Sequence, residues 1–496
     1  MGTSGVKCGV FRDDGTLLGL GRSSIPEFQS PHVGWAQSNP VLWWKGVRLS
    51  LSAAFSNAGI RPCEIDAIGL SVFYPAVVPM DSRGSALYPA ILYNDQRSGL
   101  QVDRILEKVD RREYEERIGN KLVPGTCAVT SIEWLREVKP EVFGKAKIIG
   151  FANTYLLHKL TGEFSTDPSN AALSGLTDIC NPWEWSDHLC RVFSIDPSTL
   201  PTIAGSCDVI GSVGKHCAEE TGLQYGTPVV VGCGDAVASS FGAGALQPGT
   251  VTYIGGSSDC ITMPLAKPLN DHRWINDAYL ERESWLGIGT VTSSGAALDW
   301  FSREILNISG DKTYDFFSSL PSFSDERAGG PLFLPYLQGE RTPIWDPNAR
   351  GVFFGISSST TRHELARAVL TGVAFALRDV VECIEETQGI TVEEMRAVGG
   401  STKNELWNQI KANVLQKAVQ ILDFQETGSL GAAVLAGVGV GAYHSLGEAN
   451  RYVRKFSVAR TIEPQRDKRS LYDESFQLYR RLYAKTKDLM SEQSKL

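Results

Sequence analysis

The stretch that decides the fold covers residues 227–244 and reads TPVVVGCGDAVASSFGAG. Its β-branched run, Val229–Val231, predicts a short buried strand. The tight turn Gly232-Cys233-Gly234 follows this strand, and Asp235 then begins a run of small residues that predicts a helix. A strand that passes through a glycine turn into a helix is typical of an α/β fold, whose ligands bind at the carboxyl ends of strands.

Asp235 has two interpretations, and this segment alone leaves both open. The carboxylate could simply cap the helix that follows it. It could instead accept the proton of a substrate hydroxyl, because it stands on a tight turn at a strand end. A third interpretation, a dinucleotide-binding GxGxxG loop, fails because Val237 occupies the third glycine position.

The rest of the first half alternates strand-like and helix-like stretches. Ile65–Val72 and Ala76–Met80 are short apolar runs that predict strands. Trp43–Ala58 and Ser131–Val138 have helical periodicity. This alternation predicts an α/β fold rather than a barrel made only of strands.

The second half repeats the theme. Thr250–Ile254 and Asp259–Met263 predict two strands, with Gly255-Gly256-Ser257-Ser258 between them. Near the start of the chain, Gly2-Thr3-Ser4 precedes another apolar run in the same way. A duplicated fold with one such turn in each half could hold the phosphates of a nucleotide, since backbone amides in glycine turns bind anions. We therefore predict two domains around a cleft, residues 1–245 and 246–496.

Two further regions of the second half carry helices that we expect to pack in the core. His363–Thr387 predicts a long amphipathic helix. In Leu471–Tyr483, four aromatic residues lie at helical spacing, which indicates one packing face. Residues 333–355 read as a long loop with charges among aromatics, and ordered long loops are often functional. In residues 396–419, a short strand ends at Gly399-Gly400 before a helix.

The composition excludes several classes of protein. The net charge is −8, which argues against a nucleic-acid partner, since a nucleic-acid binder would need a basic face. No run of about 18 apolar residues occurs, so we expect no membrane span. The ten cysteines include no CxxC pair, which favours reduced thiols in a cytoplasmic protein. No GxxxxGK[ST], HRD or DFG motif is present, so P-loop and protein-kinase folds are excluded.

Six stretches occur in an order that resembles the FGGY carbohydrate kinases: GTSGVK, LTGEFSTDPSNAA, GCGDAVASSFGAG, LPYLQGERTPIWDPNARGVFFGI, GGSTKNELWNQIKAN and ETGSLGAAVLAG. The likeness covers nearly the whole chain. Residues 119–143 and the YNDQR at 93–97 look most like the xylulokinases of this family.

The resemblance implies a duplicated actin/hexokinase-like (ribonuclease H-like) α/β fold that binds ATP, Mg²⁺ and a sugar. Asp235 would be the catalytic base and a metal ligand. The residues implied for ATP are Thr3, Ser4, Lys7, Gly255, Gly256, Ser257, Gly295, Asp299, Gly399, Gly400 and Asn404, with Gly256 facing the γ-phosphate. The residues expected to contact the substrate are Tyr74, Pro75, Asp95 and Asp235. The reaction would transfer the γ-phosphoryl group to a sugar hydroxyl.

The chain also departs from the family pattern. Met1 stands directly before Gly2, where the family has a strand and an Asp, so we expect the natural chain to begin several residues earlier. Gly256 stands where a Thr is usual, and Tyr74-Pro75 replaces the Met-His pair that touches xylulose. The substrate therefore stays open between a ketopentose, a tetritol, an aldonate and another small polyol. A degenerate kinase that acts as an ATP- or sugar-binding regulator is the alternative function. The oligomeric state is open, with a homodimer among the options.

Overall fold

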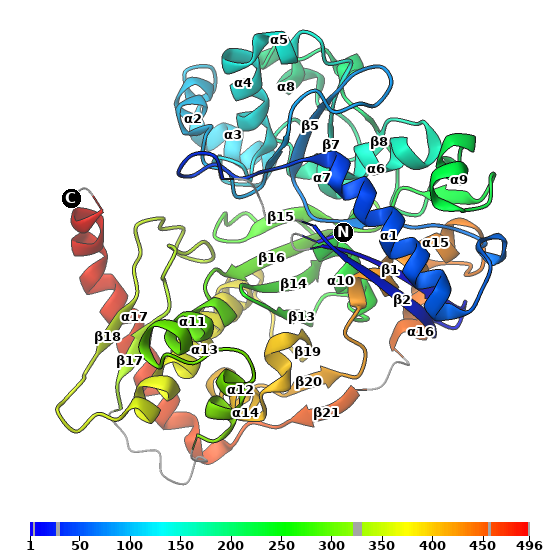
Figure 1. Ribbon diagram of the computed structural model, residues 1–496. Coiled ribbons are helices and arrows are strands. Elements are labelled where there is room, and N and C mark those ends of the chain that lie inside the picture. Colours follow the sequence, from blue (N-terminus) through cyan, green and yellow to red (C-terminus); the bar gives the residue numbers. More distant parts are fainter. Residues whose placement is uncertain (3–4, 26–29, 321–329, 455–457, 495–496) are drawn as a thin grey trace. The chain divides into compact units, whose positions relative to one another are not determined.

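The computed structural model describes residues 1–2, 5–25, 30–320, 330–454 and 458–494 (Figure 1). The chain forms two compact units, each assembled from three segments. The first unit comprises residues 1–246, 264–287 and 426–455, and the second comprises residues 247–263, 288–425 and 456–496. Two segments beyond residue 245 thus fold with the first unit. In the described part of the chain, no helix is long and apolar enough to cross a membrane.

The first unit begins with an antiparallel hairpin under a long helix. Strands β1 (Gly5–Phe11) and β2 (Leu17–Ser24) pair along their length. Helix α1 (Pro40–Ala58) begins at a capping Asn39, whose side chain accepts the Val41 N–H. The helix lies directly on the hairpin, since a Cβ at Gly21 would be 1.9 Å from the carbonyl oxygen of Ser50. Only a glycine permits this approach.

Short strands in the first unit carry the segment that opened the sequence. Strands β3 (Gln37–Ser38), β6 (Ala90–Leu92), β5 (Ala76–Met80) and β7 (Ile148–Phe151) form one sheet in that order. Beside them, β4 (Ser71–Val72) pairs in parallel with β12 (Cys233–Gly234). The strand expected at 229–231 is β11 (Pro228–Val230), and β12 follows it after the glycine turn.

Helix α10 (Asp235–Gly242) packs backbone to backbone on α15 (Thr427–Gly439). A Cβ at Gly242 would meet the carbonyl oxygen of Thr427 at 1.9 Å. A Cβ at Gly431 would meet the carbonyl oxygen of Ala238 at 2.0 Å. The small residues that predicted a helix after Asp235 therefore serve a close helix–helix contact, which explains why residues 426–455 fold with the first unit.

The second unit is built on part of a seven-stranded mixed sheet, in which five neighbouring strands run in the order β14-β13-β19-β20-β21. Their bounds are Asp259–Leu265, Thr250–Gly255, Glu394–Gly399, Val419–Leu422 and Val458–Ile462. Strands β13, β19 and β20 are parallel, and β14 is antiparallel to β13. Figure 1 shows this sheet with α13 (Arg362–Gln388), α14 (Glu405–Leu415) and α17 (Arg469–Gln493) beside it. The predicted helices 363–387 and 471–483 are confirmed within α13 and α17.

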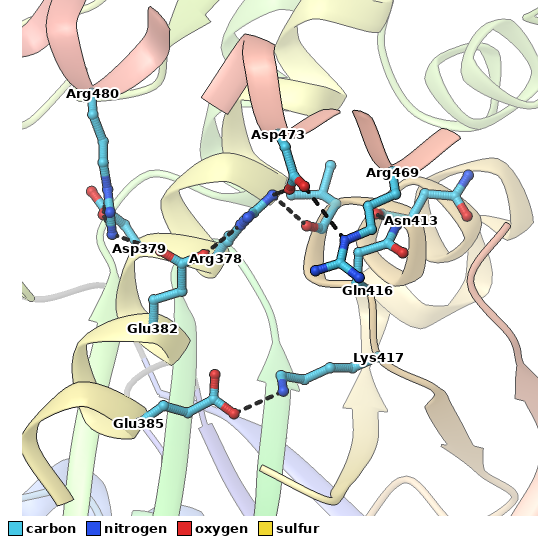
Figure 2. A network of polar contacts seen from close by, with 11 residues as sticks. Arg378, Asp379, Glu382, Glu385, Asn413, Gln416, Lys417, Arg469, Asp473 and Arg480 are labelled. Atoms are coloured by element: carbon cyan, nitrogen blue, oxygen red, sulfur yellow. Dashed lines mark hydrogen bonds and ion pairs between the residues drawn. The ribbon is translucent and has the colours of Figure 1, made fainter. Parts of the chain in front are cut away.

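Apolar and charged contacts hold α13, α14 and α17 together. Tyr472, Phe476 and Tyr479 are buried, and the rings of Phe476 and Tyr479 lie 5.7 and 5.4 Å from Phe375, which confirms their packing role. Beside this core lies a network of ion pairs, shown in Figure 2. Arg378 bridges Glu382 and Asp473, both at 2.7 Å. The network joins helices without leaving a charged group unpaired, which indicates a structural role.

Candidate functional site

Asp235 is the first residue of α10 and comes directly after β12. Strand β12 pairs in parallel with β4, with Gly234 opposite Val72. The chain beyond β4 leads to Tyr74, so Tyr74 and Asp235 follow the carboxyl ends of neighbouring parallel strands, where ligands bind in α/β folds. A Cβ at Gly234 would lie 2.1 Å from a ring carbon of Tyr74. The tyrosine ring therefore packs on the glycine that precedes Asp235.

The electrostatics of Asp235 suit a proton acceptor. Its surroundings desolvate the carboxylate and raise its pKa to about 6, while the Met1 ammonium and the Ala236 amide oppose this shift. The N-cap position of α10 belongs to Gly234, so Asp235 is not the capping residue. A carboxylate with this pKa is ionised at neutral pH and is more basic than an ordinary Asp.

Two further carboxyl groups lie behind Tyr74. The Tyr74 hydroxyl donates a hydrogen bond to Asp277, which is fully buried. Burial raises the pKa of Asp277 well above its usual value, and the nearby Asp167 raises it further. Burial also raises the pKa of the Cys233 thiol, and the charges of Asp167, Asp277 and Asp235 add to the effect. The three carboxyl groups are thus all close enough to the turn at Cys233 to act on this thiol.

Asp167 anchors this turn. It caps α7 (Pro168–Ala172) and accepts hydrogen bonds from the side-chain amides of Asn153 and Asn170, both at 2.7 Å. It also accepts a hydrogen bond from the Ser169 hydroxyl. The oxygen of Ser169 in turn accepts the Gly234 N–H at 3.0 Å. This buried network fixes the backbone immediately before Asp235.

Two other predicted substrate residues have different surroundings. Pro75 follows Tyr74 through a cis peptide bond. Asp95 is fully buried, pairs with Arg97 at 2.8 Å and accepts the Ala36 N–H at 2.5 Å. The carboxylate of Asp95 is thus engaged within the scaffold, and its contact with substrate stays a prediction.

In the second unit, two glycine turns lie side by side at the carboxyl ends of two neighbouring parallel strands, β13 and β19. Gly255 ends β13, and the residues between β13 and β14, Gly256 to Ser258, form the expected hairpin turn. Strand β13 pairs in parallel with β19, with Gly255 opposite Gly399, so the turn after β19 lies beside the hairpin. A Cβ at Gly399, whose φ is +99°, would lie 2.2 Å from the Gly255 carbonyl oxygen. Glycine is needed here both for the left-handed backbone and for the close approach.

A third turn joins them at the start of α11 (Gly295–Trp300). The N–H of Gly295 donates to the Gly256 carbonyl at 3.0 Å, and a Cβ at Gly295 would be 2.5 Å from that oxygen. By contrast, a Cβ at Gly400 would meet no atom within 4 Å. Gly256, Ser257 and Gly400 are exposed. Their backbones thus border open space, as a phosphate-binding turn requires.

The segment expected as a loop at 333–355 begins and ends in two paired strands, β17 (Leu332–Leu334) and β18 (Val352–Phe354), and the connection between them braces the third turn. The buried carboxylate of Glu340 accepts the Thr292 N–H at 2.9 Å and also binds the Thr292 hydroxyl. Burial raises the pKa of Glu340 to about 7. Thr292 lies between β16 (Trp285–Val291) and Gly295, so this carboxylate supports the connection into α11. A bracing role explains the charges in this loop.

Two predicted ATP residues have contacts of their own, a third is exposed, and two others lie outside the described residues. Asn404 is buried and caps α14, accepting the Trp407 N–H at 2.9 Å. Asp299 is exposed on α11. Lys7 on β1 pairs with Glu426 at 2.8 Å. Thr3 and Ser4 are the two predicted residues that the structure does not describe. Nucleotide contact by these residues stays a prediction.

Comparisons with known proteins match both parts of the chain. Residues 1–242 match the N-terminal domain of the FGGY family of carbohydrate kinases, and residues 251–440 match its C-terminal domain. The chain belongs to the FGGY family of carbohydrate kinases. It is therefore a phosphotransferase, and the predicted two-domain actin/hexokinase-like α/β fold is confirmed.

Relatives of this FGGY kinase align over almost the whole chain. A xylulose kinase of Bacillus subtilis (strain 168) is 29% identical over 495 residues, covering 99% of this chain and 96% of the relative. A glycerol kinase of Thermococcus onnurineus (strain NA1) is 31% identical over 488 residues, covering 95% and 94%. The crystal structure of a xylulose kinase from Rhodospirillum rubrum matches with a TM-score of 0.87 and 29% identity, covering 99% of this chain and 98% of that one.

Those residues of this FGGY kinase that the structure describes are suited to binding ATP phosphates, and they do not form a metal site before the nucleotide binds. The open glycine turns of the second unit can approach phosphate oxygens through backbone amides. Within the described residues, no group of three or more His, Cys, Asp or Glu is placed to hold a metal ion. Mg²⁺ in kinases is often bound by one or two carboxylates together with substrate phosphates, so a lone Asp235 is compatible with it.

Sequence reasoning did not find Asp277, Asp259 or Lys411. Asp277 lies in β15 (Ile275–Ala278), 203 residues from its partner Tyr74. Asp259 begins β14 directly after the glycine turn, and Lys411 lies on the buried side of α14. In the sequence, each of these three residues is only a charged residue near apolar ones. Such a pattern does not show which other residue it will contact.

Proposed function

We propose that this FGGY kinase phosphorylates a hydroxyl group of a small sugar or polyol, with ATP as donor, Mg²⁺ as cofactor and Asp235 as general base. A ketopentose such as xylulose is the favoured substrate. The observation that carries the proposal is the Asp235 carboxylate, which follows a strand end beside Tyr74 and has a pKa raised to about 6. A carboxylate with a purely structural role would be expected to form ion pairs or hydrogen bonds, and a raised pKa would serve no purpose there.

Each part of the site has a distinct task. Asp235 accepts the proton of the attacking hydroxyl as the phosphoryl group is transferred. The ring of Tyr74 borders the acceptor and orients it. Backbone amides of the two glycine turns, at Ser257 and Gly400, stabilise the phosphate oxygens, because fixed dipoles need no reorganisation during the reaction. Mg²⁺, when bound, neutralises phosphate charge, and Asp235 with the phosphate oxygens would hold it.

The charges near Tyr74 favour a neutral acceptor. Asp235 follows the glycine turn and is ionised at neutral pH, since its pKa is about 6, whereas burial raises the pKa of Asp167 and of Asp277 and favours their neutral forms. The carboxylate of an aldonate would therefore be repelled by Asp235. Xylulose kinases and glycerol kinases among the relatives act on neutral compounds, whereas one relative of 27% identity is a gluconokinase. A neutral ketose or polyol, including a tetritol, is therefore favoured over an aldonate.

One observation favours a second candidate, a regulator that binds ATP or sugar without turnover. Gly256, in the hairpin turn of the second unit, has no side-chain hydroxyl, and its backbone N–H already donates to Asp259 at 3.3 Å. Weaker interactions with the γ-phosphate in the transition state would slow phosphoryl transfer and leave the binding of ATP and sugar unchanged.

A single assay separates these candidates. The purified chain is incubated with MgATP and a panel of ketopentoses, polyols, tetritols and aldonates, and ADP release is followed by a coupled reaction. We expect acceptor-dependent ADP release with a neutral compound, abolished in Asp235→Asn. ADP release with an aldonate alone would contradict the substrate class. Saturable binding of ATP and sugar with no ADP release would establish the regulator instead.

A further inference from the structure

A chain of hydrogen bonds runs beneath the glycine turns of the second unit. The Lys411 ammonium donates to the Ser401 hydroxyl at 3.2 Å, and Ser401 lies 3.0 Å from the Tyr253 hydroxyl. Tyr253 donates to the Asp259 carboxylate at 2.9 Å. Because the Tyr253 proton is directed at Asp259, Ser401 must donate to Tyr253. All the bonds therefore run in one direction, from cation to carboxylate.

Both ends of this chain are buried charges. Asp259 is fully buried and Lys411 is 1% exposed, with its ammonium 3.9 Å from the Trp407 ring centre. Burial lowers the pKa of Lys411 to about 8 and raises the pKa of Asp259, while each charge opposes the shift of the other. Removing two charges from water is costly, and apolar residues of similar size are often as stable or more so. Overall stability is therefore a weak reason for this pair.

The chain contacts the turns themselves. Asp259 accepts the Gly256 N–H at 3.3 Å, so the carboxylate fixes the hairpin turn from below. The Ser401 hydroxyl lies against Gly255, where a Cβ would approach it to 1.7 Å. The hairpin also carries the third turn, since the carbonyl of Ser257 accepts the Ala296 N–H at 2.9 Å. One polar chain thus joins three segments that are distant in sequence.

We propose that Lys411 and Asp259 are positioning residues for the nucleotide. Through Ser401 and Tyr253 they fix the turns at Gly256 and Gly400 relative to each other, so that the amides are arranged before a phosphate arrives. Preorganised donors bind more tightly because less conformational freedom is lost on binding. This inference rests on the proposed function, in that the turns must be the ATP-binding surface.

The main test removes both charges with little change in volume, in the variant Lys411→Met/Asp259→Val. We expect it to fold, to raise the KM for ATP and the Kd of a non-hydrolysable ATP analogue by about tenfold, and to leave the KM for sugar within about twofold. Asp379→Asn is the matched control. It alters another buried carboxylate of the second unit, which lies on α13 and pairs with Arg480 at 2.6 Å (Figure 2). This control should change neither KM.

Hydrogen exchange gives a second reading that needs no nucleotide. In the double variant, segments 253–260, 293–297 and 398–402 should exchange faster together, while β6 in the first unit stays unchanged. Unchanged exchange, or equal changes in the KM for ATP and for sugar, would overturn the inference. Wild-type protein that binds no ATP analogue would instead reject the proposed function, and the exchange experiment would still decide whether the pair orders the turns.

Discussion

The hydroxyl of Tyr74 donates a hydrogen bond to the buried carboxyl group of Asp277, which lies 203 residues further along the chain. The same ring packs on Gly234, the residue before Asp235. Tyr74 is therefore held by a distant strand and by the turn that carries the proposed base. Its position relative to Asp235 depends on both contacts, so a change at Tyr74 should affect the acceptor more than the nucleotide.

Two substitutions at Tyr74 distinguish the contribution of its ring from that of its hydroxyl. Tyr74→Ala should raise the KM for the sugar by about tenfold or more, and the KM for ATP much less, because the ring borders the acceptor. Tyr74→Phe keeps the ring but removes the hydroxyl that donates to the buried Asp277, and should cost about 1–3 kcal/mol of stability. Steady-state kinetics and urea denaturation measure both effects. Tyr225→Phe, at an exposed tyrosine, is the control. If Tyr74→Ala alters neither KM, the side chain is core packing.

Asp235→Asn tests the general base. The amide keeps the shape of the side chain but cannot accept the hydroxyl proton, so kcat should fall by on the order of 10²–10⁴. Binding of a non-hydrolysable ATP analogue in the absence of Mg²⁺, measured by calorimetry, should stay close to wild type. The control is Asp103→Asn, an exposed carboxylate on α2 (Gly99–Leu106) of the same unit. Near-wild-type turnover in Asp235→Asn would show that Asp235 is not the general base.

The pH dependence of the reaction should follow the pKa of Asp235. Its pKa is raised to about 6, and the base works only when it is deprotonated. The value of kcat/KM for the acceptor should therefore increase with pH through about 6 and level off above it. With an ordinary Asp the profile would stay nearly flat down to about pH 5 and reach half of its maximum only near pH 4. A profile that stays flat between pH 5 and 7 would show that another group, or no group, takes the proton.

Gly400→Ala tests the open space at the turn after β19. A Cβ at this glycine meets no protein atom within 4 Å, so the variant should fold and melt like the wild type. The added methyl group would occupy the space that a phosphate needs, and the KM for ATP should rise by about tenfold, a loss of about 1.4 kcal/mol. Gly99→Ala, where a Cβ also meets no atom, is the matched control. Equal KM values for ATP in both variants would place the nucleotide elsewhere.

Much of the local structure could be predicted because it depends on neighbouring residues. The hairpin around Gly255-Gly256-Ser257-Ser258 follows from two apolar runs separated by glycine, and the packing faces of α13 and α17 follow from helical spacing. Asp235 could be located at a strand end for the same reason. The choice between helix cap and base could not be made locally, because it depends on the desolvation that packing imposes.

The sequence by itself determined the order of strands, turns and helices, the family, and the carboxylate at the end of β12, since hydrogen bonding and side-chain periodicity act over a few residues. Only the tertiary structure decided which polar groups meet. The parallel pairing of β13 with β19 sets Gly255 opposite Gly399 across more than 140 residues and brings Ser401 to Tyr253. Such pairs depend on the register of the sheet and on which residues become buried. Neither can be read from the order of residues along the chain.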